Sequence, residues 1–132
     1  MDNIKLMNKT VWVPGIIALF LFAACGCRDD RPVAGEYPKK GEASWYSSRV
    51  TSSGERFDKN GLTCALRRND FGGYYKVCNT ENNKCVTVRH NDFGPSIGMY
   101  SRGRIIDLSR QAFSQIAELG DGLARVTVEA LN

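Results

Sequence analysis

An alternating stretch that runs from Cys85 to Pro95, CVTVRHNDFGP, constrains the fold of this chain more than any other feature. Its alternate positions share one face of a strand, and they hold Val86, Val88, His90 and Asp92. The Gly-Pro pair that follows ends the strand. The alternation therefore predicts that Asp92 lies at the rim of a sheet or barrel. An Asp at such a turn can also serve only to cap it through its side chain.

The segments around this strand predict a small, mostly β protein. Alternating or apolar runs at 43–46, 74–79 and 124–130 are typical of short strands, and 62–66 suits a buried strand or a single helical turn. One helix is expected to begin after Ser109, a good N-cap, and to end at Gly120. Glycine-bearing turns separate these elements. Many short strands and one helix indicate a small barrel.

The same alternation places two cysteines opposite each other. Cys78 and Cys85 lie on the polar face of a hairpin whose loop spans residues 79–84. This arrangement predicts a cross-strand disulfide. Cys64 and Cys27 are left over, and whether they form a bridge stays open.

The first 24 residues are typical of an export signal. Two lysines precede a mostly apolar run, residues 11–24, which is too short for a membrane span. The residues before Cys25, Leu-Phe-Ala-Ala, resemble the bacterial lipobox, so Cys25 is expected to be the lipidated N-terminus of the mature protein, with Cys27 the second choice. An uncleaved anchor is the alternative and leaves the protein at the same membrane.

The expected domain organisation follows from this signal. Residues 25–42 are charged and contain two prolines, so they are predicted to form a lipid-anchored flexible tether, and residues 43–132 the folded domain. No Asp follows Cys25 to signal inner-membrane retention. By resemblance to sorting in diderm bacteria, the protein is expected in the cell envelope, at the outer membrane and facing the periplasm.

The charge of the chain is mildly positive. Removal of residues 1–24 takes away two lysines and one aspartate, so the net charge falls from +4 to +3. The sequence has no basic run and no aromatic-basic interleaving, so nucleic acid is not an expected partner. The small excess of positive charge is compatible with binding to a weakly anionic polymer such as the cell wall. We expect a monomer.

Five short segments, spread over residues 41–130, are collinear with one known family. They are ASWY at Ala43, TSSGERFD at Thr51, LTCAL at Leu62, VRHNDFGP at Val88 and GRIIDLS at Gly103. In this order they resemble the rare lipoprotein A-type domains. The resemblance implies a six-stranded double-psi β-barrel with one short helix after the DLS segment.

The resemblance also implies an activity: lytic transglycosylation of peptidoglycan glycan strands, preferably those without stem peptides, to 1,6-anhydro products. The expected catalytic residue is Asp92, acting first as acid and then as base in a pocket that raises its pKa. Asp107 is the candidate neighbour that raises this pKa or hydrogen-bonds the sugar. The alternative is that Asp107 interacts only with the dipole of the following helix. No cofactor and no metal are expected.

Several further residues are candidates for binding the substrate. The resemblance and the sugar-stacking capacity of aromatic rings point to Trp45, Tyr46, Thr51, Glu55 and Ser109. Tyr74 and Tyr100 could also stack on sugars. Packing in the core is the alternative for each aromatic residue.

Two departures from the family pattern keep a second function open. Phe93 replaces the arginine usual after the catalytic Asp, and Leu66 stands where the family has an active-site histidine. The alternative is a non-catalytic, expansin-like module that binds peptidoglycan. His90, expected on the same strand face as Asp92, is the candidate that takes over part of the lost role. The alternative is that His90 fills the barrel and bonds a backbone group.

Overall fold

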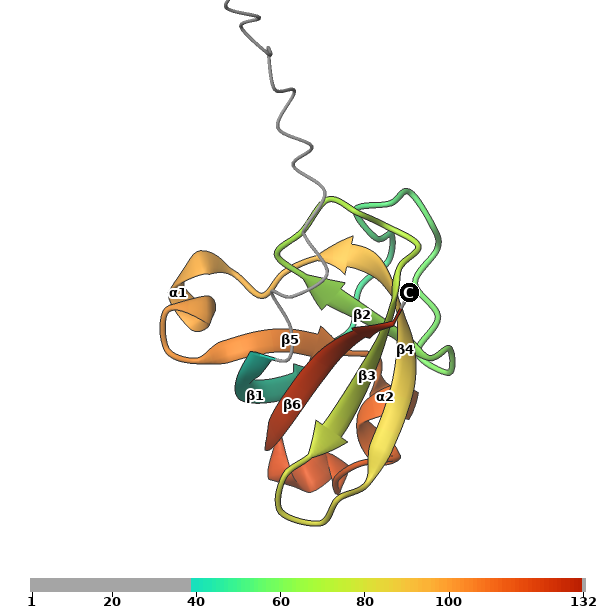
Figure 1. Cartoon of the computed structure of the whole chain (residues 1–132). Coiled ribbons are helices and arrows are strands. Elements are labelled where there is room, and N and C mark those ends of the chain that lie inside the picture. Colours follow the sequence, from blue (N-terminus) through green and yellow to red (C-terminus); the bar gives the residue numbers. More distant parts are fainter. Residues whose placement is uncertain (1–38, 132) are drawn as a thin grey trace, which may run out of the picture.

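The computed structural model describes residues 39–131, which form a closed barrel (Figure 1). Its six strands are β1 (Lys39–Trp45), β2 (Thr63–Leu66), β3 (Tyr74–Asn79), β4 (Cys85–Phe93), β5 (Arg104–Leu108) and β6 (Leu123–Leu131). Around the barrel they follow the order β1-β5-β2-β4-β3-β6. The prediction of a mostly β, six-stranded barrel is confirmed. The expected signal peptide, Cys25 and Cys27 lie outside the described residues.

The first strand begins earlier than expected. β1 starts at Lys39, which pairs with Val128 of β6, so the predicted boundary between residues 42 and 43 is wrong. The charged sequence KKGE does not predict a strand. It forms one because its backbone pairs with β5 and β6, which lie far along the chain. Gly41 is required for this fit, since a Cβ there would lie 2.7 Å from Cγ2 of Ile105 and 2.8 Å from a backbone oxygen.

The helices are shorter and more numerous than the single one expected. They are α1 (Ile97–Tyr100), α2 (Arg110–Ser114) and the 3-10 helix η1 (Leu119–Asp121). Ser109 caps α2 as predicted, because its Oγ accepts a hydrogen bond from the Ala112 N–H at 3.2 Å. The helix does not continue to Gly120. Two side-chain amides from the β3–β4 hairpin, those of Asn79 and Asn82, instead donate to the Ile116 carbonyl. Within residues 39–131, no helix is long and apolar enough to cross a membrane.

The barrel interior is filled with apolar side chains. They come from every strand, from α2 and from the turn after it, and include Ala43, Cys64, Leu66, Tyr75, Val77, Val86, Val88, Ile106, Leu108, Phe113, Ile116, Val126 and Val128. Because successive residues of a strand face opposite sides, a residue between two of these inward positions faces outward. Asp107, between Ile106 and Leu108, is such a residue. The core therefore determines which side of the barrel carries the candidate site.

The β3–β4 hairpin has the register that the alternation predicts. Cys78 pairs with Cys85 in this antiparallel register, and a disulfide joins them. Cys64 is a free thiol buried in the core. Its burial raises the pKa of the thiol well above the usual range, so it stays protonated.

Candidate active site

A row of register-paired residues crosses the outside of the barrel over four neighbouring strands. Ser44 of β1 pairs with Asp107 of β5. Asp107 also pairs with Ala65 of β2, and Ala65 pairs with Asp92 of β4. Register partners on adjacent strands present their side chains to the same face. Two of the candidate carboxylates, Asp92 and Asp107, therefore flank the small Ala65 on the outer face.

A β-bulge in β4 determines on which face of the strand the Asp92 side chain lies. Cys64 pairs with His90, but the next residue, Ala65, pairs with Asp92, so Asn91 is the extra residue in β4. An inserted residue interrupts the alternation of side chains. His90 shares the register of the core residue Cys64, whereas Asp92 shares the register of Ala65. The prediction that His90 and Asp92 lie on one face is therefore wrong.

His90 is fully buried and packs against aromatic rings. Its Nε2 lies 2.9 Å from the backbone oxygen of Asp92, and its Nδ1 lies 3.3 Å from the backbone oxygen of Asp70. The ring centroids of Phe71 and Tyr75 lie 5.1 Å and 6.1 Å from that of the imidazole. This is the packing alternative, in which the imidazole bonds backbone groups. A catalytic role for His90 loses its geometric basis.

The Asp92 carboxylate is surrounded by hydrogen-bond donors. Its Oδ1 accepts from the Ser52 N–H at 2.8 Å, the Ser52 hydroxyl at 2.7 Å and the Phe93 N–H at 2.8 Å. Its Oδ2 accepts from the Tyr46 hydroxyl at 2.8 Å. Burial raises the pKa of Asp92, but these donors outweigh it and hold the pKa below its ordinary value. The expectation of a raised pKa at Asp92 is wrong, and the group is anionic at neutral pH.

Asp107 has the opposite environment. Burial raises its pKa, and the charge of Asp92 adds to this, although the Ser44 hydroxyl and Arg104 act against it; the net effect is a raised pKa. The Ser44 Oγ donates to Oδ1 at 2.5 Å, and the Arg104 Nε lies 3.5 Å from the same oxygen. No donor among residues 39–131 is bonded to Oδ2. The raised pKa predicted for Asp92 is thus found at its neighbour.

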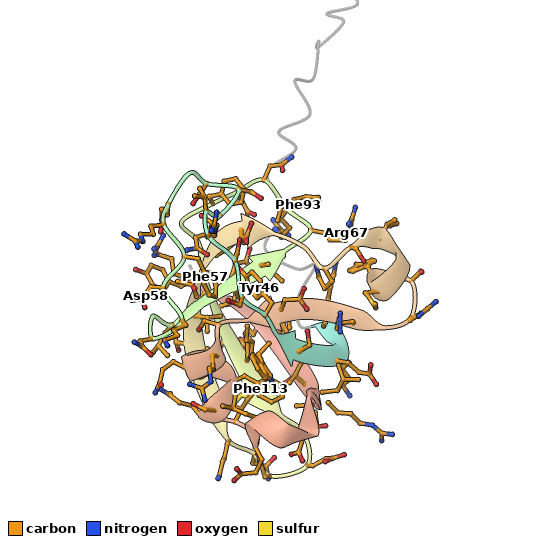
Figure 2. The ribbon with its side chains drawn as sticks, turned by 180° about the vertical axis from the view of Figure 1, so that it is seen from behind. Tyr46, Phe57, Asp58, Arg67, Phe93 and Phe113 are labelled. Carbon is orange, nitrogen blue, oxygen red and sulfur yellow. A yellow bond between two sulfur atoms is a disulfide. The ribbon has the colours of Figure 1, made fainter. Side chains whose placement is uncertain are left out.

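Tyr46 and Trp45 follow one another at the end of β1 but differ in role. Tyr46 donates to Asp92 and packs its ring 5.0 Å from that of Phe57, and burial, followed by the bond to Asp92, raises the pKa of its hydroxyl (Figure 2). It contacts the candidate site directly. Trp45 is partly exposed, and its Nε1 donates to the Leu119 carbonyl at 3.1 Å. This hydrogen bond thus connects the end of β1 with η1.

Thr51 and Glu55 hold the loop that carries Ser52. The Thr51 hydroxyl lies 2.9 Å from the Ser53 hydroxyl and donates to the Glu55 backbone oxygen at 3.2 Å. Glu55 forms a bidentate ion pair with Arg89 of β4, both N–O distances being 2.7 Å. The Arg89 hydrogen bonds lower the pKa of Glu55 to about 2. Both residues, expected to bind substrate, instead position the Ser52 donors at Asp92.

Ser109 is also occupied within the fold. It is fully buried, donates to the Gly61 carbonyl and accepts from the first turn of α2. It therefore caps the helix and has no hydroxyl free for a sugar. Tyr74 is half exposed on β3, a strand outside the row that carries the two carboxylates.

Arg67 is a residue of the site that the sequence did not reveal. Its guanidinium carbon lies 5.0 Å from the ring centroid of Phe93 and 5.9 Å from that of Tyr100. One of its nitrogens donates to the Pro95 carbonyl at 2.9 Å. Arg67 and Phe93 lie next to each other in Figure 2. The only signal in the sequence is the position directly after β2, which brings Arg67 beside the turn that follows Asp92. Among residues 39–131, no group of three or more His, Cys, Asp or Glu side chains could hold a metal ion.

A closed six-stranded barrel with parallel and antiparallel strand pairs fits the double-psi β-barrel fold, and here the two carboxylates lie on its outer face. Residues 39–128 match the profile of the lytic transglycolase family, DPBB_1. The chain belongs to this family.

Curated relatives match the same region. The proteins named endolytic peptidoglycan transglycosylase RlpA include one from Neisseria meningitidis, 40% identical over 100 residues, which are 73% of this chain and 40% of that protein. A second, from Vibrio cholerae, is 38% identical over 99 residues, 72% of this chain and 36% of that protein. A third, from Campylobacter jejuni, is 42% identical over 95 residues, 69% of this chain and 33% of that protein. The chain spans 40% or less of the length of these relatives.

Solved structures support the fold. A Streptomyces papain inhibitor superposes with a TM-score of 0.59 at 20% identity, and the match covers 74% of this chain and 96% of that one. A Clavibacter michiganensis expansin superposes with a TM-score of 0.55 at 16% identity, covering 73% of this chain and 51% of that one. At these identities the likeness concerns the fold alone.

Proposed function

We propose that this protein is a lytic transglycosylase that cleaves peptidoglycan glycan strands, preferably those without stem peptides, to 1,6-anhydro products. Relatives that are 38–42% identical carry the name endolytic peptidoglycan transglycosylase. The observation that carries the proposal is the outward pair formed by Asp92 and Asp107, whose pKa values are shifted in opposite directions. Two carboxyl groups of this kind divide into a base and an acid.

Lytic cleavage needs one proton delivered and one removed. Asp107, whose raised pKa favours the protonated form, donates its proton to the glycosidic oxygen, so that the bond between this oxygen and C1 breaks. Asp92, kept anionic by its donors, takes the proton from the C6 hydroxyl of the same sugar as O6 bonds to C1. The leaving strand departs with a free hydroxyl, and a proton then passes from Asp92 to Asp107 to restore the site.

The separation of the two groups is compatible with this division. Asp92 and Asp107 lie on strands that flank β2, so their Cα atoms are about 10 Å apart, twice the spacing of neighbouring strands. Ala65 between them adds only a methyl group. Ala65 is itself buried and lies against Gly94, so a sugar would bind above this residue, with one carboxyl on each side.

The second candidate function is a non-catalytic module that binds peptidoglycan. Leu66 favours it, because this side chain is buried in the core at the position where an active-site histidine would be expected. The expansin barrel has the same fold, and one structure of it is a complex with cellohexaose. A barrel of this kind can therefore hold a polysaccharide.

The experiment is incubation of the purified protein with peptide-free glycan strands, followed by mass spectrometry. We expect 1,6-anhydro products from the parent, and formation about 10²–10⁴-fold slower from Asp92→Asn or Asp107→Asn. Arg110→Gln, a change at an exposed position of α2, is the matched control and should cleave normally. Binding without anhydro products would select the non-catalytic module.

We also propose that Cys25 carries a lipid that anchors the domain in the cell envelope, facing the periplasm from the outer membrane. The small residues before Cys25 support lipidation, and the Cys78–Cys85 disulfide suits an oxidising compartment. Processed parent should partition into detergent, and processed Cys25→Ala should not. Equal partitioning would refute the proposal. We expect a monomer, which light scattering of the detergent-free variant would test.

A further inference from the structure

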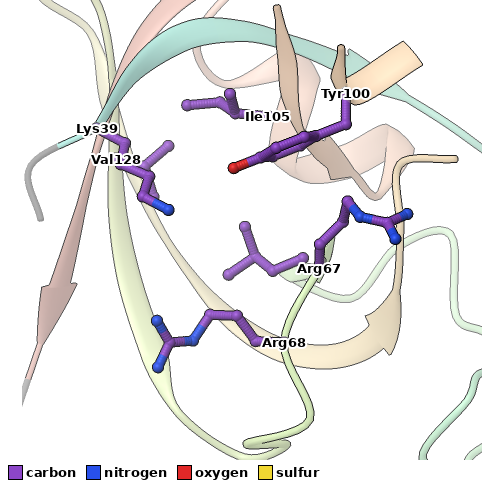
Figure 3. A pocket seen from close by; sticks show the side chains of 7 residues that line it. Lys39, Arg67, Arg68, Tyr100, Ile105 and Val128 are labelled. Atoms are coloured by element: carbon purple, nitrogen blue, oxygen red, sulfur yellow. The ribbon is translucent and has the colours of Figure 1, made fainter. Parts of the chain in front are cut away.

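Arg67 is oriented by three partners beside the turn that follows Asp92. Its guanidinium lies against the rings of Phe93 and Tyr100 and donates to the Pro95 carbonyl. Arg67 and Tyr100 also lie side by side on the wall of a pocket (Figure 3). Stacking on the rings and the hydrogen bond to the Pro95 carbonyl orient the planar guanidinium group, while most of its five N–H donors remain unused.

The partners of Arg67 differ from those of nearby arginines. Arg68 is paired with Asp70, Arg89 with Glu55, and Arg104 lies 3.5 Å from Asp107. Within residues 39–131, Arg67 has no carboxylate partner at ion-pair distance. Its partners are two rings and one carbonyl, none of which neutralises its charge. An oriented guanidinium without an anion is suited to bind a carboxylate from outside the chain, in a bidentate manner.

The position of Arg67 links it to the site. Leu66, which precedes it, pairs with Phe93, and Ala65 pairs with Asp92. The Phe93 ring that lies under the guanidinium belongs to the residue whose N–H bonds the Asp92 carboxylate. A strand bound at the carboxylate pair therefore passes close to Arg67. An anionic strand is repelled by Asp92, and a neighbouring cation offsets this repulsion.

We propose that Arg67, oriented by Phe93 and Tyr100, binds the lactyl carboxylate of an N-acetylmuramoyl residue from which the stem peptide has been removed. This inference rests on the proposed function for its substrate class. The lactyl group carries a free carboxylate only when no peptide is attached. When a peptide is present, the group is an amide without charge, and Arg67 gains no ion pair. Arg67 is then the residue through which the site distinguishes peptide-free glycan from substituted glycan.

The test measures binding without cleavage. Every protein carries Asp92→Asn so that the ligand is not consumed. The two ligands are a peptide-free glycan oligosaccharide and the same oligosaccharide with its lactyl carboxylates converted to simple amides. Dissociation constants are measured by calorimetry for the Asp92→Asn protein, and with Arg67→Gln or Arg110→Gln added. Thermal unfolding of each variant verifies that it is folded.

We expect the Asp92→Asn protein to bind the carboxylate ligand about tenfold more tightly than the amide ligand, as for one charge-assisted pair. Arg67→Gln should bind both ligands alike, and Arg110→Gln should keep the tenfold preference. A preference retained in Arg67→Gln, no preference in the protein with Arg67, or no binding of either ligand would overturn the proposal.

Cleavage assays separate this inference from the proposed function. A preference that depends on Arg67, in a protein that yields no anhydro products, would refute the lyase and leave the carboxylate subsite. Equal cleavage of both ligands by the parent and by Arg67→Gln would refute the subsite and leave the lyase.

Discussion

Asp107 and Asp92 pair with the same residue, Ala65, from opposite sides, and their surroundings move their pKa values in opposite directions. Four hydrogen bonds, donated by Ser52, Tyr46 and Phe93, favour the charged form of Asp92. Burial favours the neutral form of Asp107, and the nearby negative charge of Asp92 adds to this effect. The two carboxyl groups thus differ in charge at the same pH, as acid and base must.

The first prediction concerns the alkaline side of the pH profile. Arg104 lowers the pKa of Asp107, so Arg104→Gln should raise this pKa further. Since cleavage needs protonated Asp107, activity of the variant should persist to higher pH than in the parent. Rates of anhydro product formation across pH test this. An alkaline limb of the pH profile that stays in place or moves to lower pH would contradict this prediction. In the same assay, Asp107→Asn should lose about 10²–10⁴-fold in rate, because the acid itself is removed.

The second prediction concerns the Tyr46 hydroxyl. Tyr46→Phe removes the donor to Asp92 Oδ2, which should cost about 1 kcal/mol of unfolding free energy at pH 7. The depressed pKa of Asp92 stabilises the fold above the unfolded-state pKa, and this contribution is lost as the pH falls through the folded-state pKa. The difference between parent and variant in urea unfolding should therefore shrink in acid. A difference that does not change with pH would show that the hydroxyl contributes independently of the charge on Asp92, and no difference at any pH would show that only the ring of Tyr46 matters.

The third prediction concerns the Glu55–Arg89 ion pair. The pKa of Glu55 is lowered from 4.5 to about 2, so its stabilising effect should be present above about pH 4.5 and disappear toward pH 2. The pair is partly exposed, and screening should keep its contribution below about 1 kcal/mol. Glu55→Gln should flatten the loss of stability between these pH values in thermal unfolding. An unchanged slope would mean that the pair contributes nothing measurable.

The fourth prediction separates folding from binding at Ser109. Ser109→Ala removes the cap of α2, which should cost about 1 kcal/mol, within a range of about 0.5–2 kcal/mol. Affinity for glycan should not change, because the hydroxyl is buried and bonded within the chain. Denaturant unfolding and calorimetric titration measure the two effects. Loss of affinity in a folded variant would restore Ser109 to the substrate-binding residues.

The fifth prediction concerns the disulfide. Cys78 and Cys85 are separated by seven positions, so their bond closes a short loop and should stabilise the fold by about 2–3 kcal/mol. Cys78→Ser combined with Cys85→Ser should lower the free energy of unfolding by this amount, which is measured as a lower denaturant midpoint at an unchanged m-value. Glycan cleavage should persist below the new midpoint, since the hairpin end is remote from Asp92 along β4. A variant that is as stable as the parent would show that the pairing of β3 and β4 suffices.

Much of the barrel could be predicted because its periodicity is local. The alternation in 74–79 and 85–90 is present in the sequence, and it correctly indicates the inward residues of β3 and β4 and the opposition of Cys78 and Cys85. The cap at Ser109 is equally local. Residues 39–42 and the length of α2 were not predictable in this way, because they depend on β6 and on the Asn79 and Asn82 amides.

The sequence by itself determined which carboxylates are available, since Asp92 and Asp107 each follow an apolar strand pattern that brings them to the barrel surface or rim. Only the tertiary structure decided how they work. The extra residue Asn91 is recognised only against β2, because register is defined by a partner strand, and it separates Asp92 from His90. The pKa shifts likewise depend on tertiary structure: burial raises the pKa of Asp107, and the donors Ser52 and Tyr46, brought to Asp92 from other segments, lower the pKa of Asp92. The alternation of residues describes one strand at a time, whereas the site is formed by residues from four strands.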